Sequence, residues 1–200
     1  LTNIHISDCV LGLEPTIIIS TISAIALIKA VKDLKNEDIS LTAVASAMFF
    51  IASFIHIPFG VTQIHLILLG VLGILISWSS FVAIFVALLL QALLLGYGGI
   101  TSLGVNLFIM AAPAVIVYYI YNLNLVQNLN DKIKFFLVGF LGTFFATLFL
   151  TLILYFSKDE YNYAAYTIFS VNIVTMIIEG LVSMFLLMFI KKVYPKVLKV

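Results

Sequence analysis

The three histidines of this chain are the side chains best suited to hold a metal ion. His5 lies in the stretch LTNIHISDCVLGLEP, His56 in FIHIPFG and His65 in VTQIHLILLG. Neutral imidazole is a common ligand of nickel, copper and zinc, and cobalt accepts the same nitrogen donors. Histidine also suits a membrane interface, because its ring has an apolar body and a polar tip. The residues alone therefore leave open a metal site and a structural role.

Two further side chains are notable for their positions. Cys9 is the single cysteine of the chain. We interpret it as a packing residue, with a role as a soft metal ligand as the alternative. Glu179 falls near the middle of an apolar run, where a carboxyl group must face the interior of a helix bundle. We expect it to make structural hydrogen bonds, with Asn172 as one candidate partner, and keep a direct functional role as the alternative.

Composition identifies the class of protein to which these residues belong. Apolar residues make up 64% of the 200 residues, charged residues make up 10%, and the mean hydropathy is +1.24. So little polar surface cannot cover a water-soluble globule of this size. The chain is therefore predicted to be an integral membrane protein, and its net charge of +1 gives no indication of nucleic-acid binding.

The apolar residues fall into long continuous runs, which are typical of membrane helices rather than of the alternating strands of a barrel. We predict an all-α bundle of about seven transmembrane helices, treated as one domain over residues 1–200. The third run is short and contains Gly70 and Gly73, so we expect it to pack inside the bundle. The predicted runs are residues 15–33, 40–57, 64–77, 79–96, 104–122, 133–156 and 168–190.

Lysine positions predict the orientation of the bundle. With the N-terminus outside, seven crossings place nine of the ten lysines at the cytoplasmic face and only Lys158 outside. This is the distribution that the positive-inside rule describes. All three histidines would then face the external side, with residues 1–14 as an external segment.

Four stretches of the sequence resemble the CbiM/NikM family, the substrate-binding membrane components of energy-coupling-factor transporters for cobalt and nickel. The most specific stretch carries Gln91 and Asn106 among regularly placed glycines. The similarity covers the whole chain in order. The four stretches are IHISDCVLGLEP, IPFGVTQIHLILLG, LLLQALLLGYGGITSLGVNLFIMA and NIVTMIIEGLVSMFLLMFIKKVYP.

The resemblance implies which residues bind the metal. In this family a terminal amine, the next amide nitrogen, the imidazole of that second residue and a later histidine form a square of nitrogen ligands. His5 matches the first histidine and His65 the second, whereas His56 matches no ligand. Such a square suits Ni(II) and admits Co(II). The resemblance also places supporting polar side chains around the ligands, which we assign to Asp8, Gln91, Asn106 and Asn172.

One departure from the family pattern affects this site. His5 stands fifth here, whereas the family needs the amine directly before the histidine. We expect the four-nitrogen site to form in a chain that begins at position 4. The alternative is a transporter subunit with altered or lost metal binding, in which His5 and His65 are joined by Asp8 or Cys9 or bind no metal.

The resemblance also implies how the protein works. The family imports Co(2+) or Ni(2+) as its substrate across a prokaryotic cell membrane, together with an energy-coupling transmembrane subunit and a pair of ATPases; a small accessory membrane subunit is a further candidate partner. The sequence has no phosphate-binding G-x-x-x-x-G-K-[ST] loop, so we expect the partners to hydrolyse ATP. An intramembrane enzyme built on Glu179, His56 and His65 is a less favoured reading, because no H-E-x-x-H or G-x-S-x-G motif occurs.

Overall fold

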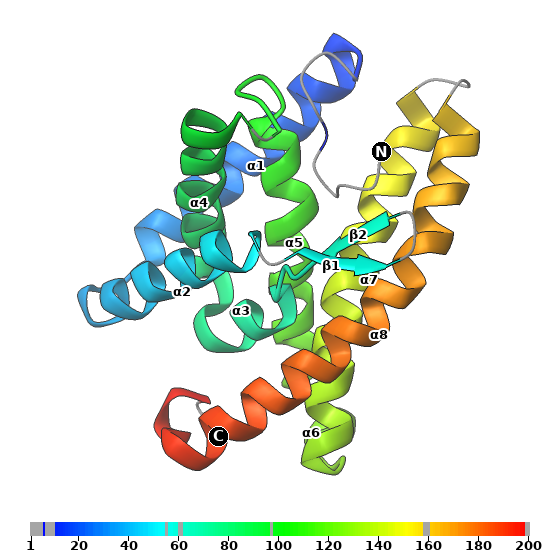
Figure 1. The fold of residues 1–200 in the computed structure, drawn as a ribbon. Coiled ribbons are helices and arrows are strands. Elements are labelled where there is room, and N and C mark those ends of the chain that lie inside the picture. Colours follow the sequence, from blue (N-terminus) through cyan, green and yellow to red (C-terminus); the bar gives the residue numbers. More distant parts are fainter. Residues whose placement is uncertain are drawn as a thin grey trace.

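The computed structural model describes residues 6, 11–54, 56–59, 62–96, 98–157 and 161–198 of the chain, and it gives the backbone alone for residues 56–59 and 62–65. Figure 1 shows a bundle of helices with one β-hairpin near its centre. The helices are α1 (Leu13–Asp33), α2 (Ile39–Ala52), α3 (Leu69–Ile76), α4 (Ser80–Leu95), α5 (Leu103–Tyr121), α6 (Asn124–Gln127), α7 (Asp131–Ser157) and α8 (Asn162–Val193). The strands are β1 (His56–Phe59) and β2 (Thr62–His65), and short 3-10 turns are η1 (Asn36–Asp38), η2 (Ser77–Ser79) and η4 (Pro195–Leu198).

The all-α membrane bundle is confirmed, and each predicted apolar run contains one helix. Within the described residues, five segments are long and apolar enough to cross a membrane. Two predicted crossings are shorter than expected. Helix α2 has 14 residues and α3 has 8, which correspond to about 21 and 12 Å of helix. The five segments are Leu13–Asp33, Leu69–Leu95, Leu103–Tyr121, Asp131–Ser157 and Ala165–Val193, the second of which joins α3 and α4.

The placement of His56 and His65 at helix ends was wrong, because both residues lie in the β-hairpin. Helix α2 ends at Ala52, and the chain pairs β1 with β2 in antiparallel register before α3 begins. Pro58 has no backbone N–H and disfavours helical conformation in the residue before it, which opposes a helix at the end of the second run. The β-branched Thr62 and Ile64 favour strand conformation in β2.

Helix α3 forms the centre of the bundle, as its glycines predicted. All eight of its residues are buried. A Cβ atom on Gly70 would overlap the backbone carbonyl of Val138 on α7, and one on Gly73 would overlap that of Ala114 on α5. Only glycine permits these helices to approach α3 so closely.

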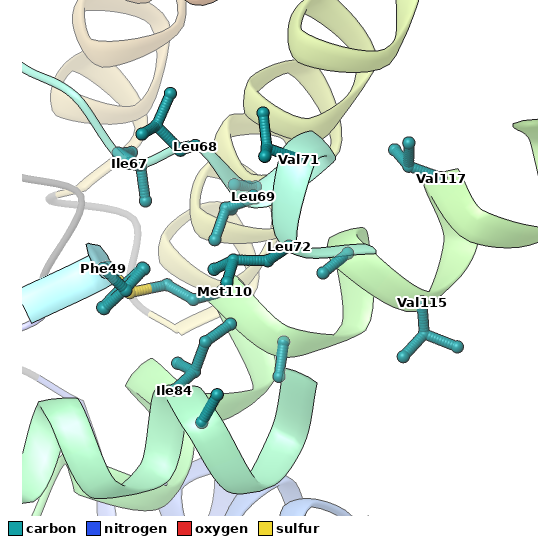
Figure 2. Packing of buried hydrophobic residues seen from close by; sticks show 14 of the residues in the cluster. Phe49, Ile67, Leu68, Leu69, Val71, Leu72, Ile84, Met110, Val115 and Val117 are labelled. Carbon is teal, nitrogen blue, oxygen red and sulfur yellow. The ribbon is translucent and has the colours of Figure 1, made fainter. Parts of the chain in front are cut away.

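Figure 2 shows the apolar side chains around this central helix. Leu72 of α3 lies beside Met110 of α5, with Phe49 of α2 and Ile84 of α4 nearby. All four side chains are at most 2% exposed and belong to one continuous buried cluster. This cluster holds the hairpin-to-α3 connection, residues 66–68, in a fixed place within the bundle.

Helices α7 and α8 form a long antiparallel pair at one side of the bundle (Figure 1). At one end the Tyr155 ring contacts that of Tyr166, with 6.4 Å between centroids. At the other end Asp131 receives a hydrogen bond of 2.6 Å from Lys191 and forms an ion pair of 3.3 Å with Lys134. The Tyr155–Tyr166 and Asp131–Lys191 contacts therefore join α7 and α8 at both ends of the pair.

Candidate functional site

The N-terminal segment is held to the bundle by the side chain of Asn106. The N–H of Ile6 donates to Asn106 Oδ1 at 2.8 Å, and Asn106 Nδ2 donates to the carbonyl oxygen of Ile6 at 2.9 Å. Ile6 is 4% exposed and belongs to the main buried cluster. Asn106 therefore satisfies both backbone polar groups of the residue that directly follows His5.

Asn106 can make this contact because of its place on α5. It lies in the first turn of the helix, where Asn106 Nδ2 also lies 3.4 Å from Ser102 Oγ, and it is 2% exposed. A buried amide without partners would cost about 1–3 kcal/mol, so its pairing with Ile6 stabilises the docked segment. Asn106 thus holds Ile6 by a pair of hydrogen bonds, and its role beside a metal ligand stays a prediction.

The hairpin places the backbones of His56 and His65 next to each other. Its register sets His56 opposite His65, followed by Ile57 opposite Ile64. Both histidine side chains lie outside the described part of the structure. Their backbone positions alone establish that the two imidazole-bearing residues are cross-strand neighbours.

The segment directly after His65 is held by Glu179 of α8. The N–H of Ile67 donates to Glu179 Oε1, and the N–H of Leu68 donates to Glu179 Oε2 at 3.1 Å. The Glu179 side chain is fully buried. The expected structural hydrogen bonds of Glu179 are therefore present, but they reach the backbone after His65 rather than Asn172.

Gln91 of α4 contacts the chain between α2 and the hairpin. Its Nε2 donates to Ser53 Oγ at 2.9 Å, and Ser53 Oγ in turn donates to the carbonyl of Phe50 at 2.6 Å. Ser53 directly follows α2, and two residues separate it from the start of β1 at His56. The Oε1 atom of Gln91 is buried and has no hydrogen-bond donor within reach among the described residues.

The remaining predicted site residues make no described contact with the backbone beside His5 or His65. Asn172 is 5% exposed, and its Nδ2 donates to the carbonyl of Ile168 at 2.9 Å within its own helix, not to Ile6 of the N-terminal segment. His5, Asp8 and Cys9 lie outside the described residues.

The structure thus provides two buried side chains that fix the backbone next to two candidate metal ligands. Asn106 binds the residue after His5, and Glu179 binds the second and third residues after His65. Ile6 and residues 66–69 belong to the same buried cluster. Sequence reasoning identified the polar side chains but not the backbone groups they bind, because those groups are 100 and 111–112 residues away along the chain.

Comparison with known proteins is consistent across sequence and structure. A family model described as "Cobalt uptake substrate-specific transmembrane region" matches residues 5–197. A putative metal transport protein of Haemophilus influenzae is 32% identical over 199 residues, which cover 97% of this chain and 96% of that protein. A fused nickel transport protein NikMN of Rhodobacter capsulatus is 35% identical over 89 residues, or 44% of this chain and 26% of that protein. The crystal structure of a truncated transition metal transporter superposes with a TM-score of 0.79 at 26% identity, covering 94% of this chain and 98% of that one.

Proposed function

Because the chain belongs to the CbiM family of cobalt and nickel transport proteins, we propose that it captures divalent cobalt or nickel ions for import. It is a multi-pass membrane transport component, and its family consists of transport proteins rather than enzymes. In this proposal the ion enters as substrate from the outer side, where residues 1–14 form the external segment. The intramembrane enzyme considered from the sequence has no support in this family.

The observation that carries the proposal is that buried side chains bind the backbone just after His5 and just after His65. Asn106 binds Ile6, and Glu179 binds Ile67 and Leu68. A site that selects a metal needs its ligands held in place by further residues, since such support raises metal affinity and sets geometry. Asn106 supplies it for the N-terminal segment and Glu179 for the hairpin. We assign His5 and His65 as ligands, because two imidazoles with nitrogen donors from the backbone suit Ni(II) and Co(II).

Transport in this proposal is driven by partner subunits. The chain would bind an energy-coupling transmembrane subunit, which a pair of ATPases moves. Helix α2 offers a surface for such a partner, because Ala43 and Ala47, one helical turn apart, are exposed on it. Small residues at this spacing allow a second helix to approach closely. Ala26 and Ala30 on α1 have the same spacing, but Ala30 is buried within this chain.

The test is metal uptake by cells or vesicles that contain this chain together with its coupling subunit and ATPases. Radioactive nickel and cobalt should accumulate only with ATP and with His65 intact. The His56→Ala variant serves as the control, because position 56 is assigned no ligand role. If uptake is absent while the assembled complex hydrolyses ATP, the alternative of a related subunit with lost or altered metal binding is favoured instead.

A further inference from the structure

Glu179 makes an unusual interaction for a carboxyl group within an apolar helix. It accepts hydrogen bonds from two successive backbone N–H groups, those of Ile67 and Leu68, and no described cation is paired with it. Buried acidic groups are expensive inside a membrane and commonly mark functional positions. The two N–H groups belong to the connection between β2, which ends at His65, and α3.

The backbone of this connection has an uncommon conformation. Leu68 has φ 56° and ψ 29°, in the left-handed region that leucine rarely adopts. A turn of this kind directs successive N–H groups toward one point and forms a concave site for an anion. The Glu179 carboxyl group occupies that point. The strained conformation persists because the carboxyl group and the buried cluster hold it there.

Glu179 itself has little freedom to move. A Cβ atom on Gly139 of α7 would overlap the carbonyl oxygen of Glu179, so the two helix backbones are in direct contact at this level. One residue further along α8, Gly180 packs against the ring of Phe136. The carboxyl group is therefore a fixed point from which the backbone after His65 is positioned.

We propose that Glu179 is the positioning residue of the metal site, which orients the His65 end of the hairpin through the N–H groups of Ile67 and Leu68. This inference rests on the proposed function and deepens it by naming the residue that links α8 to the ligand. Helix α8 continues without interruption to Lys191, which is bound to Asp131 at the far end of α7. Helix α8 therefore connects Glu179 to the contact with α7 at Asp131.

The test compares Glu179→Gln with Ser183→Ala in the purified full-length chain. Glutamine retains the shape of the side chain but replaces one acceptor oxygen with an N–H₂ group that repels a backbone donor. Ser183 is an equally buried residue one helical turn further along α8, with no described hydrogen-bond partner, so its variant controls for changes in helix packing. Three quantities are measured: amide exchange of residues 66–69 without metal, the Kd for Ni(II), and the thermal unfolding temperature.

We expect Glu179→Gln to raise amide exchange at Ile67 and Leu68 and to weaken Ni(II) binding by about 10–100-fold, the range typical of residues that orient metal ligands. The ligand-field absorption bands of bound Ni(II) should shift as well, which a loss of helix packing alone would not produce. Ser183→Ala should leave amide exchange and the Kd at the wild-type values, and it should not lower the unfolding temperature, because it removes a buried hydroxyl that has no described partner. If Glu179→Gln does not fold, Glu179→Asp, which shortens the side chain by one methylene, replaces it with the same expected pattern.

The outcomes separate this inference from the proposed function. A wild-type chain that binds Ni(II), with a Glu179→Gln variant that binds it equally well, overturns the positioning role and leaves the transport function intact. Unchanged amide exchange at residues 66–69 also overturns the positioning role, whether or not metal binds. A wild-type chain that binds neither Ni(II) nor Co(II) contradicts the proposed function itself.

Discussion

Replacing Asn106 with leucine should release the N-terminal segment from the bundle. The change removes hydrogen bonds of 2.8 and 2.9 Å and leaves the buried N–H and carbonyl of Ile6 without partners. Each hydrogen bond contributes about 0.5–1.5 kcal/mol in net terms, so loss of the two should destabilise the docked segment by about 2 kcal/mol. At about 1.4 kcal/mol per factor of ten, this corresponds to a roughly 30-fold increase in the population of the detached segment.

Amide hydrogen exchange of the peptide containing Ile6, followed by mass spectrometry, measures this population directly. Nickel affinity should fall by up to the same factor, because His5 is displaced with its neighbour. Asn172→Leu is the matched control, since Asn172 is also buried but bonds within its own helix. Equal exchange rates at Ile6 in the two variants would refute the reasoning that Asn106 holds the segment.

Three further predictions concern packing, backbone strain and orientation. Gly70→Ala should destabilise the bundle by about 1–3 kcal/mol in denaturant unfolding, because its methyl group overlaps a carbonyl of α7, whereas Gly12→Ala should be neutral, since its methyl group meets nothing closer than 3.7 Å. Ser77→Gly should raise the free energy of unfolding by about 1 kcal/mol, because Ser77 has φ 47°; an unchanged or lower value would contradict a strained turn. In a cysteine-free background, a membrane-impermeant maleimide should label Asn128→Cys only from the cytoplasm and Tyr163→Cys only from outside, and reversed labelling would contradict the orientation that the lysines predict.

The helices were predictable from the sequence because each apolar run is long and bounded by polar residues. The predicted run 104–122 and the observed α5 (Leu103–Tyr121) differ by one residue at each end. The burial of α3 was predictable from Gly70 and Gly73, since lipid-exposed helices have no need for close backbone approach. Composition and periodicity therefore predict the bundle well.

The hairpin was not predicted, because its two four-residue strands lie at the ends of the predicted runs 40–57 and 64–77, where a short apolar stretch does not distinguish a helix end from a strand. The local signals against a helix were Pro58 and the β-branched Thr62 and Ile64, and they stand among large apolar residues. The partners of Glu179 and Asn106 were beyond prediction for another reason. Each binds backbone groups at least 100 residues away, and backbone groups carry no sequence signature.

The most direct test of the account is the number of nickel or cobalt ions bound per purified chain, measured by elemental analysis after removal of free metal. For a chain that begins at position 4, we predict about one ion per chain in the parent protein and in His56→Ala, and none in His65→Ala, because loss of one imidazole opens the square of nitrogen ligands to water. Full occupancy in His65→Ala, or loss of the ion in His56→Ala alone, would contradict the assignment of His5 and His65 as the ligands.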